Sequence, residues 1–136
     1  MADFIIRLMK TQKIKIAHLE DNTSYAWWTR ATLKMRFPHI EYQHFFKVKD
    51  LMTKIKSSQF NILLLDRNID SENTIKRIKE ILYHLPDLKI MLLSASGSSK
   101  DVATALVAGA SHYFVKDSKL LSLSKVIRRE SQALAA

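Results

Sequence analysis

A run of four apolar residues near the middle of the chain, residues 62–65, limits the possible folds most strongly. It follows Asn61, ends abruptly at Asp66, and is too short to cross a membrane. Such a run, bounded by polar residues, is typical of a strand buried on both faces of a parallel sheet covered by helices. Because ligands bind at the carboxyl ends of strands in open α/β sheets, Asp66 is a candidate for chemistry. Taken alone, Asp66 could instead simply start a turn or cap the next helix.

Strand and helix patterns alternate along the whole chain. We expect further strands at residues 13–19, 40–46, 88–93 and 112–115, and helices at residues 23–36, 48–57, 71–84, 98–108 and 118–132. Strands that alternate with helices imply parallel pairing and right-handed crossovers. The predicted fold is therefore α/β, a doubly wound five-stranded parallel sheet of (βα)5 type.

The apolar periodicity also predicts which side chains of the helices face the core. The apolar–polar periodicity of the first helix runs through Tyr25, Ala26, Trp28, Thr32, Leu33 and Met35. Trp27 and Trp28 lie ~100° apart on a helix, so one of them should be in the core. The last helix should bury Leu120, Leu121, Leu123, Val126 and Ile127. Ser98 with Asp101 resembles a capping box, and Gly109 fits a helix C-cap.

Composition and length indicate one ordinary globular domain. The chain has 136 residues, of which 47% are hydrophobic, and no Cys, which excludes a disulfide scaffold and thiolate chemistry and suits the cytoplasm. Arg7 and Lys10 interrupt the apolar residues of the first segment, so residues 1–11 are expected to be a short extension rather than a signal peptide. The net charge of +9 is spread along the chain, which suits an acidic partner or simply a solvated basic surface.

Polar side chains follow four of the five predicted strands: Glu20 and Asp21, then Asp66, Ser94 and Lys116. In the segments LEDN, LLLD, LLSAS and GASHYFVK, the chain resembles the receiver domain of bacterial two-component response regulators. The resemblance implies a flavodoxin-like strand order 2-1-3-4-5, a receiver domain over residues 12–132 and a tail at residues 133–136. It further implies a cytoplasmic phosphorelay protein that is a phosphoacceptor, not an enzyme.

The resemblance assigns a role to each of these residues. Asp66 would take a phosphoryl group from a histidine kinase or phosphotransfer protein, with Lys116 stabilising the phosphoryl oxygens and Ser94 binding the product. Ser94 and Tyr113 would then form a switch that changes the face made by the fourth helix, fifth strand and fifth helix, to which an unknown downstream protein binds. Ser94 could alternatively cap the following loop, and Tyr113 could be a packed aromatic. Whether the protein forms a homodimer is left open.

Carboxylates gathered at one sheet edge repel, by about 4 kcal/mol for two unit charges ~4 Å apart at an effective dielectric near 20. Lys116 supplies one compensating charge, and Mg²⁺ would supply two more through hard oxygen ligands. Asp21 and Asp66 are the expected direct ligands, with Glu20 acting mainly through water. The family pattern adds the backbone carbonyl of Asn68.

The chain departs from the family pattern at two places. Asp117 follows Lys116 where the family usually has a proline joined by a cis bond, and a non-proline cis bond costs roughly 3–4 kcal/mol. The loop after Asp66 also lacks the usual Pro and Gly. These departures motivate an alternative, a receiver-like interaction module that no longer switches.

Three further alternatives concern other residues. A Mg²⁺-dependent phosphohydrolase is disfavoured, because Asn68 stands where haloacid-dehalogenase-like phosphatases carry a second Asp. Direct nucleic-acid binding, through Lys125, Arg128 and Arg129, is not expected. His18, in the first strand, is expected to be a core histidine with its hydrogen bonds satisfied rather than a metal ligand.

Overall fold

The computed structural model describes residues 14–116 and 120–135. Its main feature is a five-stranded parallel sheet in the order β2-β1-β3-β6-β7, which confirms the predicted order 2-1-3-4-5 of the main strands. The strands are β1 (Lys15–Leu19), β2 (Glu41–Phe45), β3 (Ile62–Asp66), β6 (Lys89–Ser94) and β7 (His112–Val115). In the described residues no helix has the length and apolar character needed to cross a membrane.

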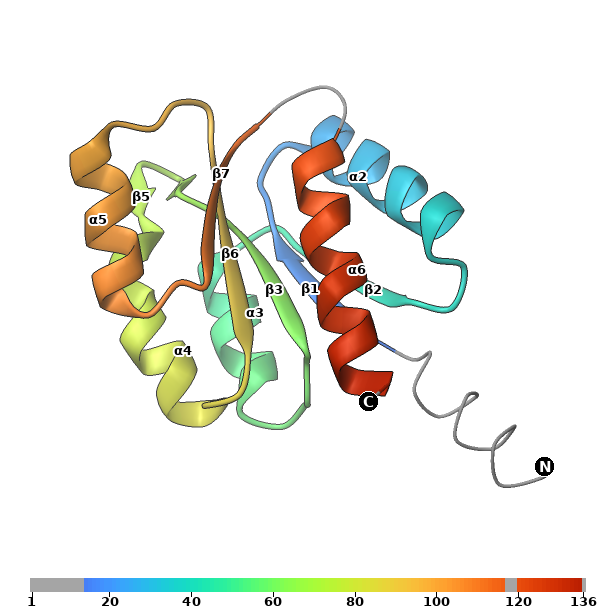
Figure 1. Ribbon diagram of the computed structural model, residues 1–136. Helices are drawn as coiled ribbons and strands as arrows, with labels where there is room; N and C mark the ends of the chain where they lie inside the picture. Colours follow the sequence, from blue (N-terminus) through green and yellow to red (C-terminus); the bar gives the residue numbers. More distant parts are fainter. Residues whose placement is uncertain (1–13, 117–119, 136) are drawn as a thin grey trace, which may run out of the picture.

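Helices cover both faces of the sheet (Figure 1). One face carries α2 (Thr23–Arg36) and α6 (Leu121–Ala135), and the other carries α3 (Val48–Ile55), α4 (Ile78–His84) and α5 (Ser99–Ala108). Alternate residues of the central strand enter the two cores: Ile62 and Leu64 pack towards α2 and α6, and Leu63 and Leu65 pack towards the other three helices. The whole of β3 is buried, as the apolar run predicts.

Local capping residues fix where several helices begin and end. The side chains of Asn22 and Ser98 accept hydrogen bonds from backbone N–H groups in the first turns of α2 and α5. Gly109 ends α5 in the left-handed conformation, with φ 119°, which a glycine adopts without steric cost. The N-caps of α2 and α5 end the loops that follow β1 and β6, at the carboxyl edge of the sheet.

The helix expected at residues 71–84 begins later than predicted, which is a correction. Residues 68–73 form a hairpin of β4 (Asn68–Ile69) and β5 (Glu72–Asn73), and a 3-10 turn, η1 (Thr74–Arg77), leads into α4. The two turn residues, Asp70 and Ser71, both have positive φ angles, 50° and 65°. Positive φ at both residues is the conformation of a two-residue hairpin turn, which normally has the sequence Asn-Gly or Asp-Gly. Because the sequence here is Asp-Ser, the hairpin could not be recognised from it.

Further comparisons with the sequence analysis concern side chains and helix ends. Leu121 is 51% exposed, so its predicted burial was wrong. Trp28 packs against the core while Trp27 is 70% exposed, as predicted for adjacent residues on a helix. Helix α6 continues to Ala135, three residues beyond the expected end, and the first residues of that expected helix lie outside the described residues.

Replacing Ser71 with Gly should stabilise the protein. The left-handed conformation costs a non-glycine residue roughly 1–2 kcal/mol, and part of that gain is offset by the greater backbone entropy of glycine in the unfolded chain. We expect S71G to raise the free energy of unfolding by about 0.5–1 kcal/mol in urea titrations. The control A103G, at an exposed position inside α5, should lower it by about 1 kcal/mol. A destabilised S71G would contradict the strained turn.

Candidate functional site

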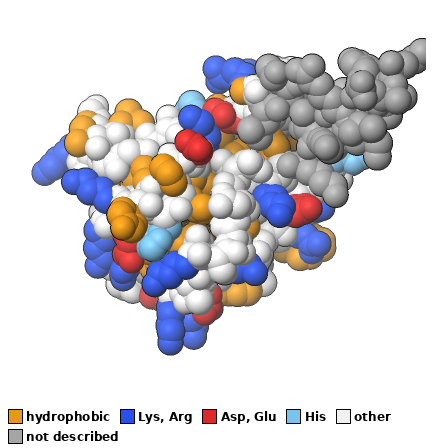
Figure 2. All heavy atoms as spheres, turned by 90° about the horizontal axis from the view of Figure 1, so that it is seen from below, with side chains coloured by type: hydrophobic (Ala, Val, Ile, Leu, Met, Phe, Trp, Pro, Cys, Tyr) orange, Lys and Arg blue, Asp and Glu red, His pale blue; other side chains and the backbone are white. Residues whose placement is uncertain are grey.

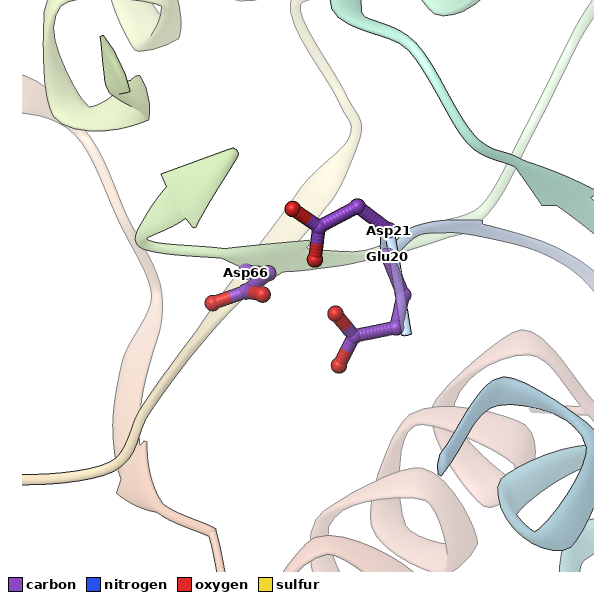
Figure 3. Close-up of side chains that lie close together, drawn as sticks. All are labelled: Glu20, Asp21 and Asp66. Atoms are coloured by element: carbon purple, nitrogen blue, oxygen red, sulfur yellow. The ribbon is translucent and has the colours of Figure 1, made fainter. Parts of the chain in front are cut away.

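Three carboxylates meet at the carboxyl edge of the sheet. Glu20 and Asp21 directly follow β1, and Asp66 is the last residue of β3, the neighbouring strand. One carboxylate oxygen from each residue lies within 4.8 Å of the others, and Figure 3 shows the three side chains turned towards a common space. Glu20 and Asp66 are buried and Asp21 is exposed, so the cluster is open to solvent on one side.

Lys116, the first residue after β7, supplies the positive charge next to this cluster. Its ammonium donates a hydrogen bond of 2.6 Å to Oε1 of Glu20 and lies 3.1 Å from Oδ2 of Asp66. The backbone N–H of Lys116 donates to the carbonyl of Ser94 at 2.7 Å, which fixes the start of the side chain. The sequence-predicted convergence of Glu20, Asp21, Asp66 and Lys116 is therefore present in the structure.

Burial and crowding change the protonation of this group. The pKa of Glu20 is raised to about 7, first by burial and then by the neighbouring Asp66, while Lys116 offsets part of the increase. Burial alone would lower the pKa of Lys116, but its interactions with Glu20 and Asp66 more than offset this and raise it. Glu20 thus holds its negative charge weakly at neutral pH, while Lys116 stays charged.

Backbone groups and one hydroxyl hold the two aspartates. The N–H of Asn68 donates to Oδ1 of Asp66 at 3.3 Å, and the N–H of Asp70 lies 3.5 Å from Oδ2 of Asp21. The buried hydroxyl of Thr74 donates to the backbone carbonyl of Asp66 at 2.6 Å. The β4–β5 hairpin and the 3-10 turn that follows it therefore hold Asp21 and Asp66 in place, a role that the sequence pattern did not predict.

Ser94 and Tyr113 lie on the two strands beyond Asp66. Ser94 is buried at the end of β6 and adjoins Leu93, the register partner of Asp66; its hydroxyl accepts a hydrogen bond from the N–H of Ser96 at 3.3 Å. The Tyr113 hydroxyl donates to the carbonyl of Ser96 at 2.7 Å. Its ring leaves no room for a side chain at Gly97, since a Cβ there would lie 2.8 Å from the ring. Both residues thus contact the loop that leads to α5.

His18 belongs to a group of polar side chains in the core near Glu20. The sequence analysis predicted that it is a core histidine with its hydrogen bonds satisfied. His18 is fully buried, and its Nδ1 lies 2.5 Å from the Tyr42 hydroxyl, which donates to the carbonyl of Ala26. Nε2 of His18 has no hydrogen-bond partner among the described residues, so the expectation holds for one ring nitrogen only. Burial lowers the pKa of His18 to about 3, with His44 and Lys116 adding to the effect, and the ring is therefore neutral.

The contacts described above do not test two expectations of the sequence analysis. Asn68 pairs with Asn73 in the hairpin, and the role of its carbonyl as a metal ligand stays a prediction. Asp117 lies outside the described residues, and so does the peptide bond that joins it to Lys116.

Two contacts around the site were missed by sequence reasoning. The ammonium of Lys116 lies 4.6 Å from the centroid of the Tyr25 ring, in the first turn of α2. Arg67, the residue after Asp66, forms an ion pair of 3.0 Å with Asp101 in the first turn of α5. Tyr25 could have been anticipated, because it lies in the first turn of the helix that begins shortly after Glu20 and Asp21. The ion pair joins residues 34 positions apart and has no local signal.

The model of the response regulator receiver domain matches residues 16–128. The chain belongs to this family. The observed sheet and acid cluster agree with the match, which covers β1 through most of α6. Receiver domains are generally signalling modules rather than enzymes.

Several curated proteins resemble part of this receiver chain. The DNA-binding transcriptional activator DevR/DosR of Mycobacterium tuberculosis is 28% identical over 81 residues, 60% of this chain and 37% of the activator. A chemotaxis protein CheY homolog of Campylobacter jejuni is 29% identical over 79 residues, 57% of this chain and 59% of the homolog. The matched segment is thus only part of each of these relatives.

Solved structures share the fold at low sequence identity. A two-component response regulator from Clostridium difficile has a TM-score of 0.82 at 15% identity and covers 90% of this receiver and 99% of its own chain. The receiver domain of a DNA-binding response regulator from Colwellia psychrerythraea has a TM-score of 0.81 at 16% identity, covering 88% and 98%. These likenesses show the flavodoxin-like receiver fold.

On the face seen in Figure 2, basic side chains do not form a single block. Figure 2, which views the molecule from the amino ends of the strands, shows Lys and Arg side chains interspersed with acidic and apolar ones. Several basic residues are also paired, such as Arg77 with Glu72 at 2.8 Å. The prediction that the receiver does not bind nucleic acid directly remains a prediction.

The raised pKa of Glu20 predicts a pH-dependent stability in metal-free protein. A carboxyl group that binds its proton more tightly in the folded state stabilises the fold below its unfolded pKa of about 4.5, and this contribution is lost as the pH rises towards 7. The shift corresponds to about 3 kcal/mol. In urea titrations between pH 4.5 and 8, Glu20→Gln should lack this contribution and gain stability relative to wild type as the pH rises. A difference between the two proteins that is independent of pH would contradict the assignment.

The Arg67–Asp101 pair predicts unequal effects for its two partners. The pair is mostly buried, with side-chain exposures of 20% and 29%. Asp101→Asn leaves the guanidinium without its charge partner and should cost about 1–2 kcal/mol. Arg67→Met should cost less, because Asp101 stays in the first turn of α5, where the helix N-terminus stabilises its charge. Lys76→Met, which breaks an exposed pair with Glu72, is the control and should change stability by less than about 0.5 kcal/mol. Equal losses in chemical denaturation for the two partners would argue against this account.

Proposed function

We propose that this protein is a phosphoacceptor switch in a two-component phosphorelay, with Asp66 as the residue that receives the phosphoryl group. The observation that carries the proposal is the grouping of three carboxylates with the ammonium of Lys116 at the carboxyl edge of the sheet. A site of this kind has a carboxylate nucleophile, a fixed ammonium and an exposed side open to further oxygen ligands.

In the proposed reaction, one carboxylate oxygen of Asp66 attacks the phosphorus of a phosphohistidine in line with the leaving nitrogen. The new O–P bond forms as the P–N bond breaks, and the imidazole of the donor leaves with the electron pair. The Asn68 N–H orients Oδ1 of Asp66, and Lys116, which contacts Oδ2, follows the charge onto the phosphoryl oxygens. The Ser94 hydroxyl then hydrogen-bonds the phosphoryl group, and its loop contacts link it to Tyr113.

The donor set fits Mg²⁺, because three carboxylates within reach of one another match the hard oxygen ligands that this ion prefers. Asp21 and Asp66 are the proposed direct ligands, joined by the Asn68 carbonyl, with Glu20 acting through water. When bound, the ion supplies positive charge for the phosphoryl oxygens. The pKa of Glu20 is raised first by burial and then by Asp66, so positive charge added beside it would favour its ionised form.

The partners follow from the proposed chemistry. The phosphoryl donor is a histidine kinase or phosphotransfer protein, and the output is a downstream protein that binds the face of α5, β7 and α6. On this face Val107 and Val115 are 86% and 52% exposed. Direct nucleic-acid binding is not part of the proposal, although one relative is named a DNA-binding activator. We place the protein in the cytoplasm, where such donors act.

A second candidate function is an interaction module that no longer switches. Two observations favour it: Lys116 already compensates Glu20 and Asp66, and Tyr113 is already hydrogen-bonded to the loop after β6. In that case the acid cluster would be a structural remnant and the α5–β7–α6 face would be constitutively presented.

Treatment with acetyl phosphate and Mg²⁺ separates the two functions. Intact-mass spectrometry should show one added phosphoryl group on the wild type and none on Asp66→Asn, because the amide is not a nucleophile for this transfer. Asp70→Asn, which alters a neighbouring exposed acid outside the cluster, is the matched control and should be phosphorylated normally. Absence of both an adduct and Mg²⁺-dependent beryllium fluoride binding would favour the interaction module.

A further inference from the structure

The aromatic ring of Tyr25 is the one neutral group in contact with the ammonium of Lys116 among the described contacts. Nζ lies 4.6 Å from the ring centroid, within the range of a cation–π interaction. The other two contacts of the ammonium are the carboxylates of Glu20 and Asp66. The ring thus meets the same ammonium that the proposed phosphoryl transfer uses.

The Tyr25 ring is held firmly enough to position another group. Its backbone N–H donates to the Asn22 side chain at 2.9 Å, within the N-cap of α2. His18 contacts the ring edge-on with centroids 6.2 Å apart, and Trp28 lies tilted against it at 5.9 Å. A capped backbone and packing from two further rings fix the plane of Tyr25.

Lys116 needs such a support because its side chain is a flexible four-carbon stem. Two carboxylates can hold the ammonium in the resting site, but both are engaged elsewhere when a phosphoryl group and a cation arrive. An aromatic face attracts the ammonium but carries no negative charge that would neutralise it. The ring also leaves the ammonium N–H groups free to donate hydrogen bonds to other groups. It can therefore hold Lys116 in place before and after the transfer.

We infer that Tyr25 is a positioning residue for Lys116, holding the ammonium over its ring so that it can move from the carboxylates to the phosphoryl oxygens. The inference rests on the proposed phosphoacceptor function. It assigns a role in that function to the first turn of α2, through a side chain that contacts neither the phosphoryl group nor the cation.

Two variants separate the ring from its hydroxyl. Tyr25→Phe keeps the ring and should be phosphorylated by acetyl phosphate within about twofold of the wild-type rate, whereas Tyr25→Leu should be slower by about tenfold. Mg²⁺-dependent affinity for beryllium fluoride should fall in Tyr25→Leu by a similar factor. Trp27→Leu removes an exposed aromatic ring two residues away and is the matched control for loss of an aromatic from α2. Urea midpoints of all variants show whether each is folded.

A spectroscopic measurement tests the contact without any phosphorylation. The ε-methylene protons of Lys116, assigned by comparison with Lys116→Arg, should show an upfield ring-current shift in the wild type and in Tyr25→Phe. The shift should be absent in Tyr25→Leu and retained in Trp27→Leu. A wild type without the shift, or a Tyr25→Leu variant phosphorylated at the wild-type rate, would overturn the inference. If the wild type takes no phosphoryl group, the proposed function fails, and the ring-current shift alone decides whether Tyr25 positions Lys116.

Discussion

The contact between one ammonium and two buried carboxylates is the interaction on which the carboxyl edge of this protein depends. Without Lys116, two acids buried side by side would repel by several kcal/mol, and burial would force protons onto them. The contact also links three strands of the sheet, because Glu20, Asp66 and Lys116 lie at the carboxyl ends of β1, β3 and β7. Asp66 itself ends a strand that is buried along its whole length.

The sheet could be predicted because each buried strand is encoded by a short stretch of neighbouring residues. A buried parallel strand is a short apolar run, and each run here appears where the sequence places it, to within a few residues. The hairpin after Asp66 could not be predicted, because Asp70 and Ser71 adopt a conformation that their sequence does not favour and that tertiary contacts impose. The exposed Leu121 shows a related limit: periodicity identifies the apolar side of a helix but not how much of that side the neighbouring elements cover.

The candidate site was predictable to the extent that it consists of strand ends. Parallel strands bring their carboxyl ends to one edge, so Glu20, Asp21, Asp66 and Lys116 had to be neighbours once the strand order was right. The supporting contacts come from elsewhere. Thr74 reaches the Asp66 carbonyl only because the hairpin turns the chain back, and Arg67 meets Asp101 across two elements. Such contacts depend on loop geometry, for which a single sequence carries no periodic signal.

The features around Asp66 share one property, which is that each lowers the stability of the resting fold. Glu20 is buried with a raised pKa, His18 is buried with one ring nitrogen lacking a partner among the described residues, and the hairpin contains two left-handed residues. Strain of this kind persists only where the surrounding structure determines it, and it gathers at functional sites. A cation bound between the acids would relieve the first of these costs directly. The resting site is therefore arranged so that binding positive charge stabilises the fold, which is the condition for coupling ligand binding to a change in the neighbouring loops.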